Sequence, residues 1–193
     1  MTIKAITKLI KERKSTYAYD FSEKEIPKNT IEDIVENALW APTHLHTQPW
    51  RFIVLKGKHQ QELGEFMADY YREMYTEKKF SNERFEATKN YSKNATLLAV
   101  IFKPNKKAKL PEWEELAAIA CGVQNMWLSC TALNIGCYWD TSVATMKYGK
   151  SIDLDGDEKF LGIFYMGHLK NEIQFRKRKR KSLSKKLSYD YKN

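Results

Sequence analysis

Residues 40–52 read Trp-Ala-Pro-Thr-His-Leu-His-Thr-Gln-Pro-Trp-Arg-Phe, and one kind of secondary structure gives way to another within them. The apolar residues between 31 and 39 recur at helical spacing. Pro42 ends that helix, because proline has no amide hydrogen to continue it. Residues 50–55 alternate and are rich in β-branched and aromatic side chains, which predicts a strand. The stretch is therefore a helix end, a polar loop and the start of a strand.

The rest of the chain repeats this alternation of helices and strands. Helical spacing predicts further helices at residues 2–13, 58–79, 82–93 and 111–133, and the helix before Pro42 should be capped by Asn29 or Thr30. Apolar runs predict further strands at 96–102, 137–142 and 160–167. The order lacks the regular strand–helix–strand spacing of a doubly wound sheet. We expect one α+β domain over residues 1–193, with a mostly antiparallel or mixed central sheet flanked by helices.

Composition excludes several classes of protein. Hydrophobic residues make up 42% of the chain and charged residues 30%, with 8 glycines and 5 prolines, which argues against disordered and collagen-like chains. Cys121, Cys130 and Cys137 are odd in number and lack CxxC spacing, so we expect buried thiols in a reducing compartment. The N-terminal apolar residues are interrupted by lysines, and the uncharged run 116–139 contains amides, so we expect a soluble, cytoplasmic protein without a membrane span.

The positive charge is concentrated at the C-terminus. The formal net charge is +9, and the basic segment 176–193 carries +8 of it. Such a run can bind nucleic acid, act as an import signal or touch anionic lipid. The alternative is a solvated tail in which one or two residues hold a phosphate. Because the rest of the domain is nearly neutral, nucleic acid is the less favoured partner.

Common catalytic motifs are absent from the sequence. It contains no GxGxxG, no GxxxxGK[ST] and no GxSxG, so neither a dinucleotide-binding fingerprint nor a P-loop nor a nucleophile elbow is indicated. His44 and His46 have no nearby cysteine or carboxylate in the sequence, and two ligands are too few to predict a metal site. If the protein is an enzyme, a cofactor should carry the chemistry.

Three segments place polar residues beside apolar ones at element ends: Arg13-Lys14-Ser15, the 41–52 block, and Gly136 with Trp139-Asp140-Thr141. On these residues, in this order, the sequence resembles the nitroreductase family of FMN-dependent oxidoreductases. The resemblance covers almost the whole chain, whose length is similar to the compact branch of that family. It implies an intertwined homodimer with two FMN sites, each built from both subunits. The helix at about 113–133 would form the dimer seam, although a core helix of a monomer explains its lack of charge equally well.

The resemblance also implies roles for individual residues. The FMN phosphate would be held by Arg13, Lys14 and Ser15, with Arg178 or Arg180 from the tail. The alternative for this first group is a basic helix end that complements the helix dipole. The other implied FMN-binding residues are Thr43, His44 and His46 at the flavin edge or ribityl chain, Trp40 and His44 facing the partner's cofactor, and Trp139, Asp140 and Thr141 beside the ring.

Some of these positions depart from the family pattern. Lys14 stands where an arginine is typical, and lysine lacks bidentate phosphate geometry. Thr43 and His46 replace the usual serine and asparagine, and Asp140 stands where a compact relative can have arginine. For Trp40, helix-end packing is an equal alternative, and for residues 139–141 an ordinary strand end.

The activity that the resemblance implies is electron transfer from NADH or NADPH through FMN to nitroaromatic, quinone or similar flat acceptors. Both half-reactions would use the same site in turn, a ping-pong mechanism, and no catalytic side chain is required. Two alternatives stay open. One is a flavoprotein of the same fold with another reaction, such as dehalogenation or flavin processing, since a fold does not fix a reaction. The other is a basic nucleic-acid-binding protein.

Overall fold

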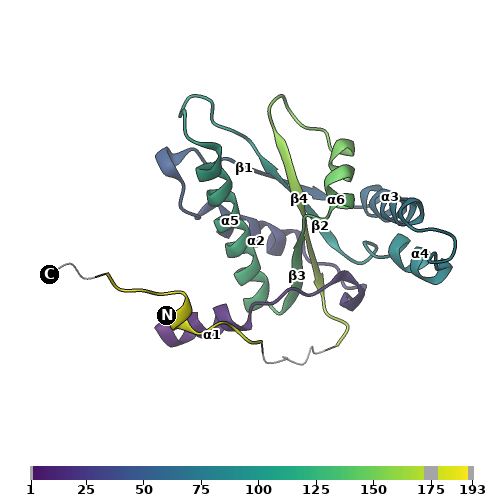
Figure 1. Ribbon diagram of the computed structural model, residues 1–193, viewed down its shortest axis with the longest axis horizontal. Helices are drawn as coiled ribbons and strands as arrows, with labels where there is room; N and C mark the ends of the chain where they lie inside the picture. The colour runs from purple at the N-terminus through teal and green to yellow at the C-terminus, as the bar shows by residue number, and fades with distance from the viewer. Residues whose placement is uncertain (1, 172–177, 191–193) are drawn as a thin grey trace.

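The computed structural model describes residues 2–171 and 178–190, and a four-stranded sheet lies at its centre (Figure 1). The strands are β1 (Trp50–Leu55), β2 (Thr96–Phe102), β3 (Ile135–Asp140) and β4 (Lys159–His168), in the spatial order β1-β2-β4-β3. Every neighbouring pair is antiparallel, so the sheet is antiparallel rather than mixed. All seven residues of β2 are buried, because helices cover both faces of this central strand.

Two helices cover one face of the sheet. They are α2 (Lys28–Leu39) and α5 (Glu112–Ala132), whose apolar residues share a core with Leu98, Val100 and Phe102 of β2. Gly122 of α5 faces α2 so closely that a Cβ there would lie 3.1 Å from the carbonyl oxygen of Ala38. The two helices can therefore approach each other because this position has no side chain.

The opposite face is covered by a second set of helices. α3 (Lys58–Met74) and α6 (Val143–Tyr148) pack on Leu97, Ala99 and Ile101, the alternate residues of β2. α4 (Asn82–Lys89) packs against α3 through Phe85, Ala68 and Tyr71. Figure 1 shows α2 and α5 on one side of the sheet and α3, α4 and α6 on the other.

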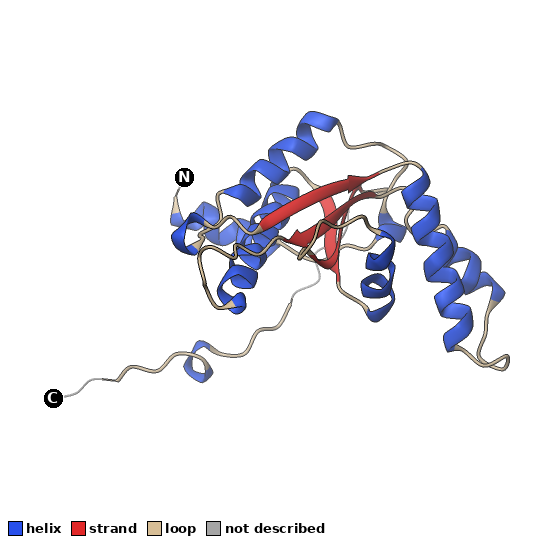
Figure 2. Cartoon of the chain, turned by 90° about the horizontal axis from the view of Figure 1, so that it is seen from above, coloured by secondary structure: helices blue, strands red, loops and turns tan. Residues whose placement is uncertain are grey.

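The first helix and the C-terminal segment lie outside this core. α1 (Ile3–Glu12) is capped by Thr2 and buries no residue, although Ile3, Ile6 and Ile10 give it an apolar face. The described C-terminal residues lead away from the body, as both views show (Figures 1 and 2). Arg176, at the start of the predicted basic segment, lies outside the described residues. No described helix is long and apolar enough to cross a membrane.

Most predicted elements are confirmed, and several bounds are wrong. The strands predicted at 50–55 and 96–102 have those bounds. The helix predicted at 58–79 ends at Met74, and the one predicted at 82–93 ends at Lys89. Neither Asn29 nor Thr30 is the N-cap of α2: the helix begins right after Pro27, whose fixed φ suits a helix start. The sequence patterns indicated the elements better than their ends.

Two corrections affect the region after α5. β3 begins at Ile135 and ends at Asp140, not at Ser142, because Ser142 instead caps the short helix α6, which the sequence analysis missed. All three cysteines are free thiols, but Cys121 is exposed on α5 and only the other two are buried. The exposed thiol lies on a helix face that no other part of the described chain covers.

Candidate functional site

The segment after α1 is fixed against α5 by one tryptophan. Arg13 is the C-cap of α1, and its guanidinium lies over the Trp127 ring, 4.7 Å from the ring centroid. The Trp127 indole Nε1 donates to the carbonyl oxygen of Lys14 at 3.0 Å. Two residues on, the amide of Thr16 donates to the carbonyl of Cys137 at 3.0 Å, so the chain continues along β3. Ser15 is exposed between these anchors.

Tail cations join this segment. The Arg178 guanidinium donates to the carbonyl oxygens of Arg13 and Lys11, the last carbonyls of α1. Burial lowers the pKa of Arg13 and of Lys14, and the charge of Arg178 lowers both further. Arg180 is also close enough to lower the pKa of Arg13. Arg178 thus repels Arg13 and Lys14, and Arg180 repels Arg13, so an anion bound among them would be stabilised. We call Arg13, Lys14, Arg178 and Arg180 the cationic cluster.

A cavity of about 760 Å³ adjoins the cationic cluster, which is within the size range of small-molecule sites. Lys14 and Thr16 line one side of it, and Lys24, His168 and Lys170 line another. Burial, and next the charge of Lys24, lowers the pKa of His168, whose Nε2 is buried without a hydrogen-bond partner among the described residues. No sequence motif links Lys24, His168 and Lys170, and only the fold brings them beside Lys14, so the sequence did not indicate them.

The loop between α2 and β1 is held by its own threonines. The Thr43 and Thr47 hydroxyls lie 3.0 Å apart, and the amide of Gln48 donates to the Thr43 hydroxyl at 3.1 Å. Three non-glycine residues here adopt left-handed backbone: Leu45, His46 and Gln48, with φ of 50°, 52° and 46°. Such conformations cost free energy and are common where a loop presents side chains to a ligand.

His44 connects this loop to α5. Its ring Nδ1 lies 2.6 Å from Oε2 of Glu114, in the first turn of the helix. His44 is 57% exposed and Glu114 24%. Trp40, the C-cap of α2, is 80% exposed, which argues against helix-end packing within one chain. Trp40, His44 and His46 are therefore exposed at the surface, and His44 also contacts α5 of the same chain.

The third predicted group lies at the end of β3. Trp139 packs against the core shared by α2 and α5, and its Nε1 is buried without a hydrogen-bond partner among the described residues. Asp140 uses both carboxylate oxygens locally: Oδ2 accepts from the Thr145 hydroxyl at 2.6 Å, and Oδ1 accepts from the amide of Ser142 at 2.9 Å. Asp140 therefore holds the start of α6, whereas Thr141 is exposed.

These groups do not all come together in one subunit. The cationic cluster contacts α5 at Trp127, and the 43–48 loop contacts it at Glu114. Thirteen helical residues separate these two contact points, or about 20 Å at 1.5 Å per residue. Arg13, Lys14 and Arg180 lie together, while Trp40, Thr43, His44 and His46 lie toward the other end of the same helix. The two groups of predicted cofactor residues therefore lie at separate places along α5.

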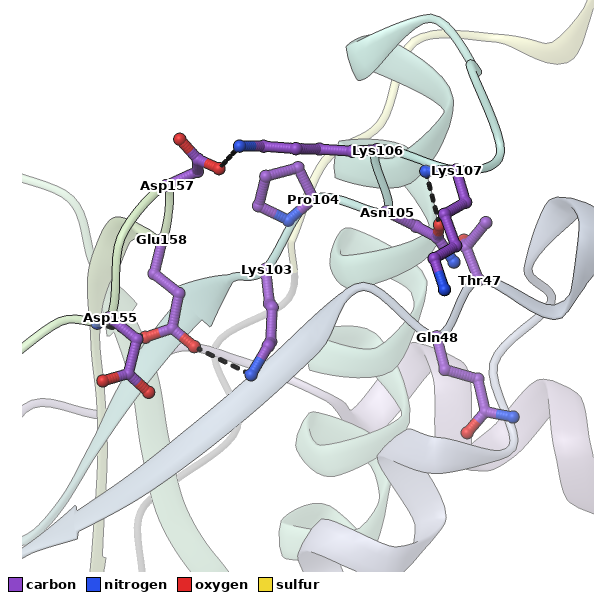
Figure 3. Close-up of a pocket in the computed structure, with 10 residues that line it drawn as sticks. All are labelled: Thr47, Gln48, Lys103, Pro104, Asn105, Lys106, Lys107, Asp155, Asp157 and Glu158. Atoms are coloured by element: carbon purple, nitrogen blue, oxygen red, sulfur yellow. Dashed lines mark hydrogen bonds and ion pairs between the residues drawn. The ribbon is translucent and has the colours of Figure 1, made fainter.

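A second pocket, of about 430 Å³, lies beside the 43–48 loop and is balanced in charge (Figure 3). It contains three lysines, but Lys106 pairs with Asp157, and Lys103 pairs with Glu158 at 3.7 Å. Glu158, whose side chain is 2% exposed, also accepts two hydrogen bonds from Arg51, at 2.5 and 2.8 Å. These carboxylates neutralise the lysines, so this pocket suits an anion less well than the cationic cluster does.

A metal centre is not evident at either place. Within residues 2–171 and 178–190, no three histidine, cysteine, aspartate or glutamate side chains are arranged to hold a metal ion. His44 is bonded to a carboxylate, and the fold does not bring His46 to further ligands of this kind. The candidate site therefore consists of the cationic cluster, a polar loop and the half-buried Trp139.

Comparison with known proteins identifies the family. The Nitroreductase family profile matches residues 10–168. The chain is 24% identical over 164 residues to the "Putative NAD(P)H nitroreductase YfhC" of Bacillus subtilis, covering 82% of each protein. It is 30% identical over 141 residues to the human iodotyrosine deiodinase 1, and this match covers 60% of the present chain and 48% of the deiodinase.

A solved structure shows the same fold. The FMN-dependent nitroreductase NfnB of Mycobacterium smegmatis, in complex with NADPH, superposes with a TM-score of 0.70 at 19% identity, covering 97% of this chain and 99% of that one. Taken with the family match over most of the chain, these findings show that the protein belongs to the nitroreductase family of flavin-dependent NAD(P)H oxidoreductases.

Proposed function

We propose that the protein is an FMN-dependent enzyme that takes electrons from NADH or NADPH and passes them to a nitroaromatic, a quinone or a similar flat acceptor. The single observation that carries the proposal is the cationic cluster within a nitroreductase-family fold. When bound, FMN supplies the ring system that accepts a hydride and passes electrons on. The residues of the chain bind and orient the cofactor and exclude water.

The cationic cluster fits the phosphate end of FMN. A phosphate carries up to two negative charges at neutral pH and three strong acceptor oxygens. Arg13 and Lys14 are partly desolvated and repelled by Arg178, so a dianion would relieve an unfavourable arrangement. Ser15 is exposed beside them and can add a hydroxyl donor. Arg180, near Arg13, completes the proposed phosphate site.

The site is completed by a second subunit in this proposal. The outer face of α5 exposes Ala117, Ala120 and Cys121, which are small and uncharged. Two copies of α5 packed antiparallel would place the Glu114 end of one beside the Trp127 end of the other. Trp40, Thr43, His44 and His46 of one subunit would then face the cationic cluster of its partner. The exposed apolar face of α1 would also be covered in such a homodimer.

Trp139 and Thr141 are assigned to the ring end of the cofactor, on the same subunit as the cationic cluster. Trp139 Nε1, which finds no partner within the described part of the chain, is a donor that a heteroaromatic ligand can satisfy. Asp140 is assigned to this region only as a scaffold, since Thr145 and Ser142 already occupy its carboxylate. Its negative charge would nevertheless lie near the ring.

One comparison favours a second candidate function. The deiodinase is 30% identical over 141 residues, a match that covers 60% of this chain, whereas the 4-nitrobenzoate reductase of Nocardioides is 32% identical over only 69 residues, or 36% of this chain. Reductive dehalogenation is therefore the alternative reaction, ahead of flavin processing. Nucleic-acid binding is disfavoured because the positive charge is confined to residues 176–193 and the rest of the domain is nearly neutral.

The test begins with the purified protein. We expect flavin absorbance, release of FMN on denaturation and a dimer by light scattering. Anaerobic reduction with NADH and with NADPH should then be followed by reoxidation with a nitroaromatic, a quinone or a halotyrosine. Release of halide from the halotyrosine, with slow reoxidation by the other two, would select dehalogenation. A protein that takes up no FMN on reconstitution, or stays strictly monomeric, would refute the proposal.

A further inference from the structure

We propose that Glu114 is a positioning residue that sets the orientation and ring tautomer of His44 in the composite cofactor site. This inference rests on the proposed function, because His44 meets a cofactor only if the partner's cationic cluster lies opposite it. The observation is the 2.6 Å contact between His44 Nδ1 and Glu114 Oε2. At this distance the histidine donates from Nδ1, in a bond that the negative charge of the carboxylate strengthens.

The contact determines which ring nitrogen is left for a ligand. When Nδ1 donates to a carboxylate, that carboxylate fixes both the tautomer and the orientation of the ring. Nε2 is then the nitrogen left for a ligand. In the neutral ring, Nε2 would then be an acceptor, and in the protonated ring a donor. Without Glu114, the ring of an exposed histidine can rotate and exchange tautomers freely.

The backbone beneath His44 is already fixed by other contacts. The carbonyl of His44 accepts from the amide of Thr47 at 3.2 Å, and the Thr43 hydroxyl closes the loop from the other side. The left-handed conformations of Leu45 and His46 complete the turn. Since the backbone is fixed in this way, Glu114 restrains only the side-chain torsions of His44.

Glu114 is itself well placed for this role. It lies in the first turn of α5, where the helix dipole stabilises a carboxylate. The same turn provides a matched control, because Glu112 Oε2 accepts from Lys159 Nζ at the same distance of 2.6 Å. Glu112 belongs to no part of the proposed site. Glu112→Gln therefore removes an equivalent charge and ion pair without touching His44.

The first experiment needs no cofactor. The ¹⁵N chemical shifts of the His44 ring, measured in the protein without FMN, report which nitrogen carries the proton. We expect a predominantly Nδ1-protonated neutral ring in the wild type and in Glu112→Gln, and a mixture of tautomers in Glu114→Gln. Identical spectra for Glu114→Gln and the wild type would overturn the inference. Because no FMN is present, this result stands apart from the proposed function.

The second experiment measures FMN affinity by quenching of flavin fluorescence. Glu114→Gln should weaken binding several-fold, Glu112→Gln should not, and thermal unfolding checks that each variant is folded. In a His44→Ala background, Glu114→Gln should have no further effect, since it acts only through His44. An equal loss in both backgrounds would mean that Glu114 acts on its own and would refute the positioning role. A wild type that binds no FMN would refute the proposed function, while the ring spectra still decide the His44–Glu114 contact.

Discussion

At the scale of single residues, the side chains that interact most closely belong to two groups with different roles. Arg13 stacks on Trp127 and shares its surroundings with other cations, so its charge is left for an external anion. Arg51 instead donates twice to the buried Glu158, so its charge is used within the fold. We therefore expect removal of Arg13 to reduce the affinity for FMN, and removal of Arg51 to reduce the stability of the fold.

Arg13→Ala should weaken FMN binding by tens of fold. The physical reason is the loss of one charge-assisted phosphate contact, worth on the order of 2 kcal/mol. Arg72→Ala is the matched control, because Arg72 also stacks on an aromatic ring, with its guanidinium carbon 4.1 Å from the Phe85 centroid. Fluorescence titration with FMN measures both. Equal affinities for the two variants would remove Arg13 from the cofactor site.

Arg180→Gln should weaken FMN binding at low salt and change affinity little at high salt. A cation on the exposed tail acts on the phosphate mainly through space, and added salt screens such interactions. Lys186→Gln, also exposed on the tail, is the control. Titrations at two ionic strengths make the measurement. If Arg180→Gln binds FMN as tightly as the wild type at low salt, the tail does not reach the phosphate.

The Arg51–Glu158 pair should make stability depend on pH in the acid range. The hydrogen bond from Arg51 lowers the pKa of Glu158 in the folded state, below its ordinary value of 4.5. The stabilisation is therefore fully present above that value and is lost as the pH falls through the lowered pKa. Chemical unfolding across this range should show the free energy of unfolding falling more steeply in the wild type than in Glu158→Gln.

A second variant checks the same pair at neutral pH. Arg51→Ala leaves the buried carboxylate paired, among the described residues, with the more distant Lys103 alone, and should cost about 3 kcal/mol of stability. This loss should appear in thermal unfolding while FMN affinity per folded molecule stays unchanged. If Arg51→Ala is as stable as the wild type, the Glu158 carboxylate has moved to a position where water solvates it.

At the scale of elements, the junction of β3 and α6 depends on one carboxylate. Asp140 ends the strand and accepts from both Ser142 and the buried Thr145. The resemblance made Asp140 a candidate for the cofactor, but its contacts hold Ser142, the N-cap of the following helix, and Thr145 in its first turn. The two roles predict different results in the protein without FMN.

Asp140→Ala should lower the free energy of unfolding of the apoprotein by about 2 kcal/mol, because the buried Thr145 hydroxyl loses its acceptor. Asp153→Ala, at an exposed position in the loop before β4, should change it little. Thermal and urea unfolding without FMN measure the difference. If Asp140→Ala unfolds like the wild type but binds FMN poorly, the carboxylate contacts the cofactor rather than the helix.

At the scale of the whole molecule, α5 connects the proposed site to the proposed assembly. One end of the helix holds the segment with Arg13, and the other end holds His44. Its exposed, uncharged face lies between these ends. Dimerisation and cofactor binding should therefore be lost together.

Ala120→Lys should convert the dimer to monomer and abolish FMN binding, because it places a charge at the centre of the proposed seam where water is excluded. Gln61→Lys adds the same charge on the exposed surface of α3 and should change neither property. Light scattering and FMN titration on the same samples make the test. A monomeric Ala120→Lys variant that still binds FMN fully would contradict a site shared between subunits.

The sequence by itself determined the elements that its own periodicity encodes. The apolar run of β2 and the alternating residues of β1 are local patterns, and both strands have the predicted bounds. Residues 41–52 and the short Arg13-Lys14-Ser15 segment indicated the family because residue type and order alone carry such motifs. The missed α6 is short, with only six residues, and its N-cap Ser142 is held by a hydrogen bond to Asp140 that no spacing rule reports.

Only the tertiary structure decided which residues are neighbours. Trp127 fixes Arg13 and Lys14 from more than a hundred positions away, and Glu114 meets His44 across 70. No local pattern encodes such contacts, because they arise when distant segments pack on one helix. The same packing separates the contact of Arg13 from that of His44 by thirteen residues of α5, or about 20 Å, for the physical reason that a helix is rigid and advances about 1.5 Å per residue.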